Sequence, residues 1–210
     1  MPRSRPATPS SESRARPTLG RPRSEQAHRA ILAAALDLLR DEGYVALTID
    51  AIAKRAGVAR TTIYRWWPSA GSIAVDVLIE LGATLAPPPT PGGDPLRAIR
   101  LEMRRIASVA AELPGPLLAA ILGEAQNDPA IRVALMERII YPRREATMRV
   151  VREAQALGLI RDDVSPPVVT DLFFGPIFYR MLMGHDIATE RFATQTFERT
   201  LAGLAPTTSK

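Results

Sequence analysis

A stretch of 20 residues that begins at Ile49 constrains the fold of this chain more than any other feature. Its fifth position is the small Ala53, where two helices cross closely, and its ninth is Gly57, where a turn needs a positive φ. Five further positions are apolar and spaced to seal the inner faces of two helices: Ile52, Ala56, Val58, Ile63 and Trp66. An ordinary helix pair in an all-α core needs only the glycine. The complete pattern therefore favours a helix-turn-helix, which places its second helix in the DNA major groove.

The composition excludes several classes of protein. The chain has 210 residues, 46% of them hydrophobic, which suits one or two globular domains. No apolar run approaches the roughly 18 residues of a membrane span, and the N-terminus lacks the apolar stretch of a secretory signal, so we expect a cytoplasmic protein with no membrane partner. There is no cysteine, and the two histidines lie far apart in the sequence, so we expect no disulfide, metal site or cofactor.

The formal net charge of +5 lies at one end of the chain. Residues 1–23 contain six arginines and one acidic residue, Glu12, whereas residues 24–210 contain 21 basic and 21 acidic residues. Residues 1–23 are also rich in proline and almost free of apolar side chains. Such a segment buries too little surface to offset the entropy of ordering. We therefore predict a disordered basic arm.

The rest of the chain has the three- and four-residue apolar spacing of helices, with no strand pattern and no internal repeat. Ser24 is a candidate cap for the first helix, Pro142 predicts a kink or a split, and Thr189 is a candidate cap for the last helix. The Pro- and Gly-rich residues 86–95 predict a loop or a weak domain boundary. The predicted helices cover about 24–43, 70–85, 96–109, 116–124, 129–157, 166–183 and 189–203, and the helix-turn-helix at 48–67 adds two short helices on either side of Gly57.

The segment from Leu47 to Ser69 resembles the DNA-binding signature of the TetR (TetR/AcrR-type) family of bacterial transcriptional regulators, and the resemblance extends over residues 24–80. It implies an all-α protein with a three-helix DNA-binding domain at 24–70 and a helical ligand-binding and dimerisation domain at 71–205, before a short tail at 206–210. It also implies a nucleoid-associated, ligand-responsive repressor that binds a palindromic operator as a homodimer. Two positions depart from the family pattern.

These departures are Ala59, where the family often has Ser or Thr, and Ala70, where it often has Lys. Each replaces a side chain that is able to contact a DNA phosphate, and Ala59 also removes a helix cap. Neither departure affects the packing positions. We therefore expect the domain to fold as in the family and to make weaker contacts with the DNA backbone.

We expect two kinds of DNA contact from the helix-turn-helix. Base contacts should come from the start of the second helix, since arginine binds guanine bidentately and the threonine methyl packs on thymine. The candidates for base contacts are Arg60, Thr61, Thr62 and Arg65. The candidates for phosphate contacts are Thr48, Lys54, Arg55, Arg60, Tyr64 and Arg65. We expect Trp66 and Trp67 to pack in the core.

The arm offers a second route to DNA. Gly20-Arg21-Pro22-Arg23 resembles the core of an AT-hook, in which arginines such as Arg21 and Arg23 enter a narrow A·T-rich minor groove. The match is short, and a merely solubilising tail explains the same composition. Both interpretations stay open on the sequence.

The family resemblance also implies a small-molecule pocket in the C-terminal domain and a two-fold dimer interface made by the helices at 166–183 and 189–203. Methionine and aromatic side chains suit an adaptable apolar cavity, although an ordinary core needs the same residues. The main candidates for the pocket are Met103, Tyr141, Met148, Phe174, Phe178 and Met181, with Ile106, Leu118, Leu122 and Tyr179 as further members.

No catalytic motif is present in the sequence. We find no nucleophile elbow, phosphate-binding loop, metal spacing or carboxylate pair, so we expect no catalytic residue and no enzyme activity. The alternative function is that of an architectural or weakly specific DNA-binding protein that uses the basic arm. It would show little preference for a palindrome, whereas a regulator should prefer its operator by roughly a thousandfold.

Overall fold

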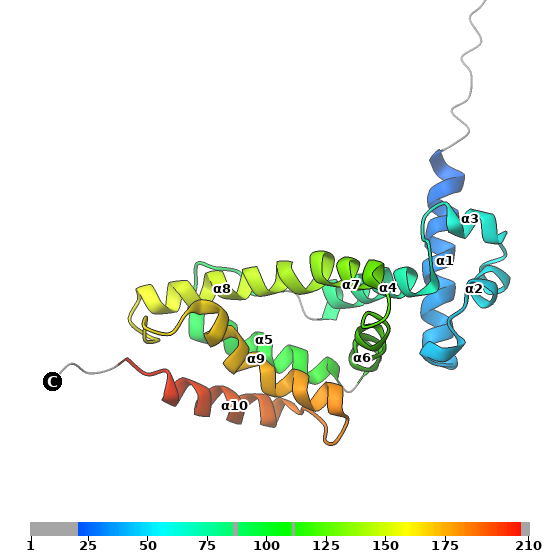
Figure 1. Ribbon diagram of the computed structural model, residues 1–210. Coiled ribbons are helices and arrows are strands. Elements are labelled where there is room, and N and C mark those ends of the chain that lie inside the picture. Colours follow the sequence, from blue (N-terminus) through cyan, green and yellow to red (C-terminus); the bar gives the residue numbers. More distant parts are fainter. Residues whose placement is uncertain (1–20, 86–87, 111, 207–210) are drawn as a thin grey trace, which may run out of the picture.

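The computed structural model describes residues 21–85, 88–110 and 112–206, and the regular structure within these ranges is entirely helical (Figure 1). The all-α prediction is confirmed. The helices are α1 (Arg21–Asp41), α2 (Ile49–Ala56), α3 (Arg60–Tyr64), α4 (Ala70–Leu85), α5 (Pro95–Ala110), α6 (Pro114–Glu124), α7 (Pro129–Leu135), α8 (Tyr141–Ala156), α9 (Pro166–Met183) and α10 (Glu190–Gly203). A 3₁₀ turn at Tyr44–Ala46 and a π-helical turn at Met136–Ile140 complete the described structure.

Local sequence signals set several helix ends. The Thr48 hydroxyl accepts a hydrogen bond from the Ala51 N–H (3.1 Å) and caps α2, and Gly57 ends that helix in the left-handed conformation (φ 66°). Thr189 caps α10 in the same way, by accepting from the Phe192 N–H (3.1 Å). These are the caps and the stop that the sequence predicts.

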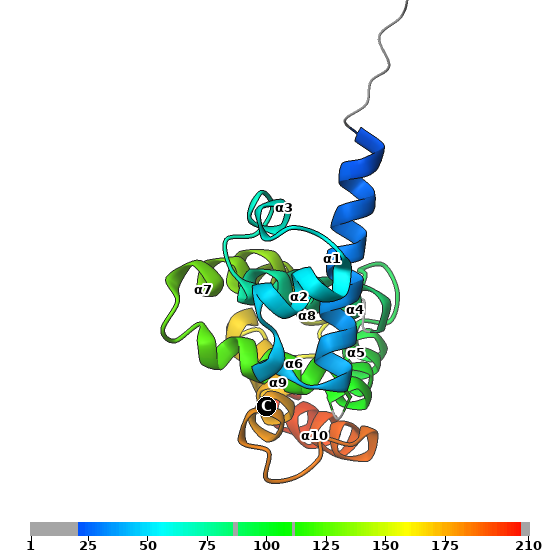
Figure 2. The ribbon, with the colours of Figure 1, turned by 90° about the vertical axis from the view of Figure 1, so that its right-hand side faces the viewer.

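The molecule consists of a head and an elongated body (Figures 1 and 2). In the head, α2 and α3 pack beside the upright α1, and α4 leads from the head into the body, where α5, α8, α9 and α10 lie together. One hydrophobic cluster joins α1–α4 to α6 and α7, and a second joins α5, α8, α9 and α10. The first cluster crosses the expected boundary at residue 70, so the head is packed directly onto part of the body.

Pro142 splits the long helix that the sequence predicts over 129–157. Proline has no N–H to donate and its ring clashes with the carbonyl four residues earlier, so it disturbs the α-helical hydrogen bonding of the turn before it. The chain accommodates Pro142 with the π-helical turn Met136–Ile140, in which the Tyr141 N–H bonds to the Met136 carbonyl five residues back. This turn separates α7 from α8, so the α-helical hydrogen bonding changes where the sequence predicts a kink or a split.

Three boundaries differ from the sequence prediction. Helix α6 begins at Pro114, two residues before the expected Pro116. Helix α1 begins at Arg21, three residues before Ser24, because a proline such as Pro22 is tolerated in a first turn whose N–H groups have no helical partner. Helix α3 ends at Tyr64, and the Trp66 N–H bonds to the Ile63 carbonyl three residues back. The chain therefore leaves the second helix earlier than expected, ahead of Pro68.

Candidate DNA-binding face and cavity

The outer face of α3 is accessible to solvent. Arg60, Thr61, Tyr64 and Arg65 are exposed, Thr62 is half-buried, and Ile63 is fully buried against the head. Buried Ile63 anchors the short helix and fixes which side faces outward. The structure therefore brings the predicted base-contacting residues together on one accessible surface.

Two basic side chains of this region, Arg55 and Arg60, form ion pairs with carboxylates of the head. The Arg60 Nε lies 2.5 Å from the Asp50 Oδ1 in an exposed ion pair. Arg55 pairs with Asp41 (2.9 Å) and with Glu42 (2.8 Å), which fastens α2 to the end of α1. Arg55 thus has a structural partner on the head, in addition to the phosphate contact that we predict for it.

The structure describes the side chains of only some of the remaining candidates for DNA contact. Lys54 and Thr48 are exposed, although the Thr48 hydroxyl is already engaged as the α2 cap. Arg21 and Arg23 lie in the first turn of α1, but their side chains and residues 1–20 lie outside the described residues. The minor-groove contact of the arm stays a prediction.

The two departures from the family pattern have different consequences. Helix α3 has no side-chain cap, because Ala59 precedes it, as the sequence indicates. Near Ala70, Ser69 and Ser72 form reciprocal hydrogen bonds: the Ser72 N–H donates to the Ser69 Oγ (3.2 Å) and the Ser69 N–H to the Ser72 Oγ (3.3 Å). The start of α4 is therefore stabilised without a basic side chain.

The expectation that Trp66 packs in the core is wrong. Its side chain is 39% exposed and its ring centroid lies 4.7 Å from that of His28. Trp67 is buried, and its indole N–H donates to the Asp76 Oδ2 (2.7 Å). Because α3 ends before this pair, the turn directs only the second tryptophan inward.

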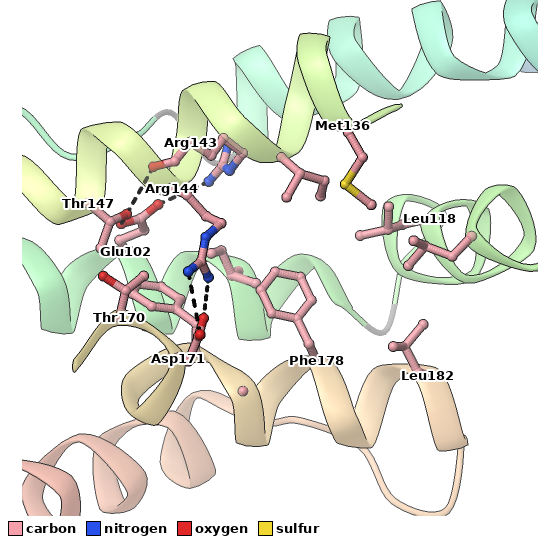
Figure 3. A pocket seen from close by; sticks show the side chains of 15 residues that line it. Glu102, Leu118, Met136, Arg143, Arg144, Thr147, Thr170, Asp171, Phe178 and Leu182 are labelled. Carbon is pink, nitrogen blue, oxygen red and sulfur yellow. Dashed lines mark hydrogen bonds and ion pairs between the residues drawn. The ribbon is translucent and has the colours of Figure 1, made fainter. Parts of the chain in front are cut away.

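A cavity of about 270 Å³ lies in the body, lined by residues of α5, α6, the π-helical turn, α8 and α9 (Figure 3). Its walls are mostly apolar and include Leu118, Met136 and Leu182 at one end. The apolar side chains that line it are Ile106, Leu118, Leu122, Met136, Ile140, Phe174, Phe178 and Leu182. A smaller cavity of about 90 Å³ shares five of its residues and continues toward Met181.

The other end of the cavity is polar (Figure 3). Glu102 is only 3% exposed; one carboxylate oxygen accepts from Arg143 (3.2 Å) and the other from the Thr147 hydroxyl (3.1 Å). Burial raises the pKa of Glu102 to about 7, although the charge of Arg143 and the hydrogen bonds act in the opposite direction. Beside this group, Arg144 pairs with Asp171 of α9.

Three of the six main pocket candidates line the two cavities. Phe174 and Phe178 line the larger cavity, and Met181 lines the smaller. The further candidates Ile106, Leu118 and Leu122 also line the larger cavity, whereas Tyr179 is exposed on α9.

Three predicted pocket residues lie elsewhere. Met103 is fully buried in the packed core of the body, Tyr141 is 60% exposed, and Met148 is absent from both cavity linings. The inner face of α8 is instead formed by Arg143 and Thr147. The side of α8 that lines the cavity is therefore polar, and the apolar residue type of Met148 does not place it there.

The polar lining residues were missed by the sequence analysis. Glu102 did leave a signal, because it shares one face of α5 with Ile99, Met103 and Ile106 at three- and four-residue spacing. A carboxylate in an apolar stripe is seldom buried without a partner. The missed lining residues are Glu102, Met136, Ile140, Arg143, Arg144, Thr147, Thr170, Asp171, Gly175 and Leu182.

Polar contacts join the head to the walls of the cavity. Asp76 of α4 accepts from Trp67 and also pairs with Arg138 (2.5 Å), which belongs to the same π-helical turn as Met136 and Ile140. Farther along, the Tyr44 hydroxyl of the head donates to Glu124 at the end of α6. A change in the cavity walls therefore has two short structural routes to the head.

The outer side of α9 carries an apolar stripe. Val168, Leu172, Tyr179 and Met183 are exposed at intervals of four and seven residues, which places them on one side of the helix. A large exposed apolar patch typically marks an interaction surface. Within the described residues, no single helix is long and apolar enough to span a membrane.

The two halves of the chain match two parts of one protein family. Residues 31–72 match the bacterial regulatory proteins of the tetR family, and residues 89–200 match the tetracyclin repressor-like C-terminal domain. The HTH-type transcriptional regulator YdeS of Bacillus subtilis is 30% identical to this chain over 190 residues, which cover 90% of this chain and 96% of YdeS.

Solved structures give the same result. The TetR family transcription regulator SCO0332 superposes with a TM-score of 0.69 at 30% identity, covering 86% of this chain and 100% of that protein. FadR of Thermus thermophilus, a TetR family repressor crystallised with lauroyl-CoA, superposes with a TM-score of 0.61 at 25% identity, covering 83% of this chain and 91% of FadR.

Proposed function

The chain belongs to the TetR family of bacterial regulatory proteins, and from this premise we propose that it is a homodimeric repressor that releases a palindromic operator when an effector fills the cavity of about 270 Å³. It is a DNA-binding, ligand-responsive transcriptional regulator. One observation carries the proposal: the exposed face of α3 and the cavity belong to one packed molecule and are joined through Asp76.

The DNA contacts that we propose start from the exposed side of α3. Arg60 leaves Asp50 to contact a guanine, and Thr61 and Thr62 contact neighbouring bases. Tyr64 and Arg65 bind phosphates, together with Lys54 and Thr48. Arg55 keeps its contacts with α1 and adds positive potential near the backbone.

The dimer that we propose uses the apolar stripe on α9, with α10 beside it. One short recognition helix specifies too few base pairs by itself, and a two-fold dimer doubles the site. Burying this stripe against its copy removes Leu172, Tyr179 and Met183 from water, which favours association by roughly 25 cal/mol per Å² of apolar surface.

The effector acts, in this proposal, by favouring a different spacing of the two heads. A ligand shifts an equilibrium only by its differential affinity for the two states. Met136 and Ile140 line the cavity, and Arg138 on the same π-helical turn holds Asp76 of α4. Displacing that turn moves α4, and with it the head.

The test is operator binding measured by fluorescence anisotropy on a palindrome from the adjacent promoter. We expect Arg60→Ala to weaken binding by about tenfold to a hundredfold, the usual cost of losing a base contact. The matched control is Arg149→Ala, which removes an exposed arginine from α8 in the body. Equal affinities for R60A and R149A would exclude the proposed recognition face.

The architectural alternative is not favoured, because the relatives are named as transcriptional regulators over nearly the whole length of the chain. The same assay separates the two functions. A repressor prefers its palindrome over bulk DNA by roughly a thousandfold or more, and an architectural protein does not.

A further inference from the structure

Four charged side chains lie at the polar end of the cavity, and they differ in whether their charge changes with protonation. Arg143 and Arg144 stay protonated at any physiological pH. Asp171 is exposed and paired with Arg144. Glu102 is 3% exposed and has an arginine and a threonine hydroxyl as partners.

The other walls add little charge to this end. Arg105, on the same helix as Glu102, acts on it only through its charge, from an exposed position. Helix α6 and the π-helical turn contribute only apolar side chains to the cavity lining. Of the lining groups, two are therefore fixed cations and two are anions, and Glu102 is the buried anion.

This arrangement selects the sign of a ligand. The arginines are permanent cations, so the charge of the polar end changes through Glu102: when Glu102 takes up a proton, this end becomes more positive. A cationic head group would lie against two permanent cations, and like charges repel. An anionic head group would instead compete with Glu102 for Arg143.

We propose that the effector is an amphiphile with a carboxylate head, which binds Arg143 and Arg144 while Glu102 takes up a proton, and with an apolar tail that extends toward Leu118, Met136 and Leu182. The proposal rests on the proposed function of the cavity and names the chemical class that it binds. A neutral Glu102 keeps its hydrogen bond with Thr147 by donating or accepting, since a protonated carboxyl does both.

The protonation step has a low cost near neutral pH. Burial already raises the pKa of Glu102 to about 7, so the neutral form is well populated before any ligand arrives. The carboxylate of the ligand stays ionised over the same range, because its pKa is near that of an exposed glutamate, about 4.3. Binding therefore takes up a proton at the protein and releases none from the ligand.

The experiment compares three probes that share one tail: decanoate, decan-1-ol and decylammonium. Their dissociation constants for the full-length protein are measured by calorimetry at pH 6, 7 and 8. For a Glu102 pKa of about 7, decanoate should bind about tenfold more weakly at pH 8 than at pH 6. Decan-1-ol should show no such dependence, and decylammonium should bind more weakly than decanoate at every pH.

Proton uptake is a second measurement that needs no variant. Calorimetry of decanoate in buffers of different ionisation enthalpy should give an uptake of about 0.9 proton at pH 8 and about 0.1 at pH 6. The variant Glu102→Gln should abolish this uptake. It should also bind decanoate about tenfold more tightly than the wild type at pH 8, because the cost of protonation is gone.

The outcomes separate this inference from the proposed function. Tighter binding of decan-1-ol or decylammonium, no binding of decanoate, or zero proton uptake at pH 8 would each overturn the carboxylate inference. Operator affinity of the wild type without any probe is measured in parallel. If the wild type does not bind the operator, the repressor function is contradicted, independently of the results with the three probes.

Discussion

Glu102 is an ionisable residue that the packing of α5, α8 and α9 buries almost completely. Burial raises its pKa to about 7, and Arg143 and Thr147 offset only part of that effect. Between the unfolded pKa of 4.5 and the folded pKa of about 7, the folded state binds more protons than the unfolded state. The free energy of unfolding therefore falls as the pH rises through this window.

The variant Glu102→Gln tests this linkage through stability. The shift from 4.5 to about 7 predicts that the variant gains roughly 2–3 kcal/mol of stability relative to the wild type between pH 5 and pH 8. Urea unfolding of both proteins at pH 5, 6, 7 and 8 gives the difference directly. A constant difference across this range would show that Glu102 ionises in the folded state as it does in water.

Asp50 supplies a second prediction at the residue scale. Its carboxylate pairs with Arg60 on the proposed DNA face and adds negative charge there. Asp50→Asn should tighten binding to any DNA duplex by roughly threefold at low salt, since an exposed pair is worth at most about 1 kcal/mol. The matched control is Asp37→Asn on α1, and the gain should vanish at high salt. An equal gain in both variants would indicate a net-charge effect only.

The helices themselves were largely predictable because their ends are set by local chemistry. The Thr48 and Thr189 caps, the Gly57 stop and the Pro142 split each depend on residues within one or two turns. The cavity was only partly predictable, because its lining depends on which face of each helix turns inward. Arg143 and Thr147 form the inner face of α8, a choice that rests on a carboxylate 41 and 45 residues away.

The corner between α5 and α6 gives a prediction at the scale of the element. A Cβ added at Gly115 would overlap the carbonyl oxygen of Ala110, so the two helices meet too closely for any side chain there. Gly115→Ala should lower the free energy of unfolding by about 1–3 kcal/mol. A methyl at Gly123 of the same helix meets no atom within 4 Å.

Gly123→Ala is therefore the matched control for Gly115→Ala. It should leave stability unchanged or raise it by up to about 1 kcal/mol, because alanine favours the helix over glycine. Urea unfolding measures both variants. Similar destabilisation of the two proteins would mean that the close approach at Gly115 does not require glycine.

The whole molecule gives a prediction about assembly. Leu172 is at the centre of the exposed apolar stripe of α9, and a carboxylate there would have to be buried in the proposed dimer. Leu172→Glu should convert the dimer to a monomer in sedimentation experiments and weaken operator binding. The control, Leu157→Glu, places the same charge at an exposed leucine after α8. A dimeric L172E protein would exclude α9 from the interface.

The distribution of charge over the whole molecule leads to the last prediction. Residues 24–70 hold six basic and five acidic groups, and the caps near Ala59 and Ala70 add no cationic side chain. The head alone therefore offers DNA little net positive charge, and all of the formal net charge of +5 lies in residues 1–23. If the arm contacts phosphates, its arginines must appear in the salt dependence of binding.

Deletion of residues 2–20 removes four arginines and leaves the whole of α1 in place. Each lost phosphate contact lowers the slope of log K against log salt by about 0.9, so the slope should fall by up to about 3–4 per subunit. The slope is obtained from the operator affinity measured at salt concentrations between about 50 and 200 mM. Replacement of the four arginines by glutamine separates charge from length, and an unchanged slope would remove the arm from the mechanism.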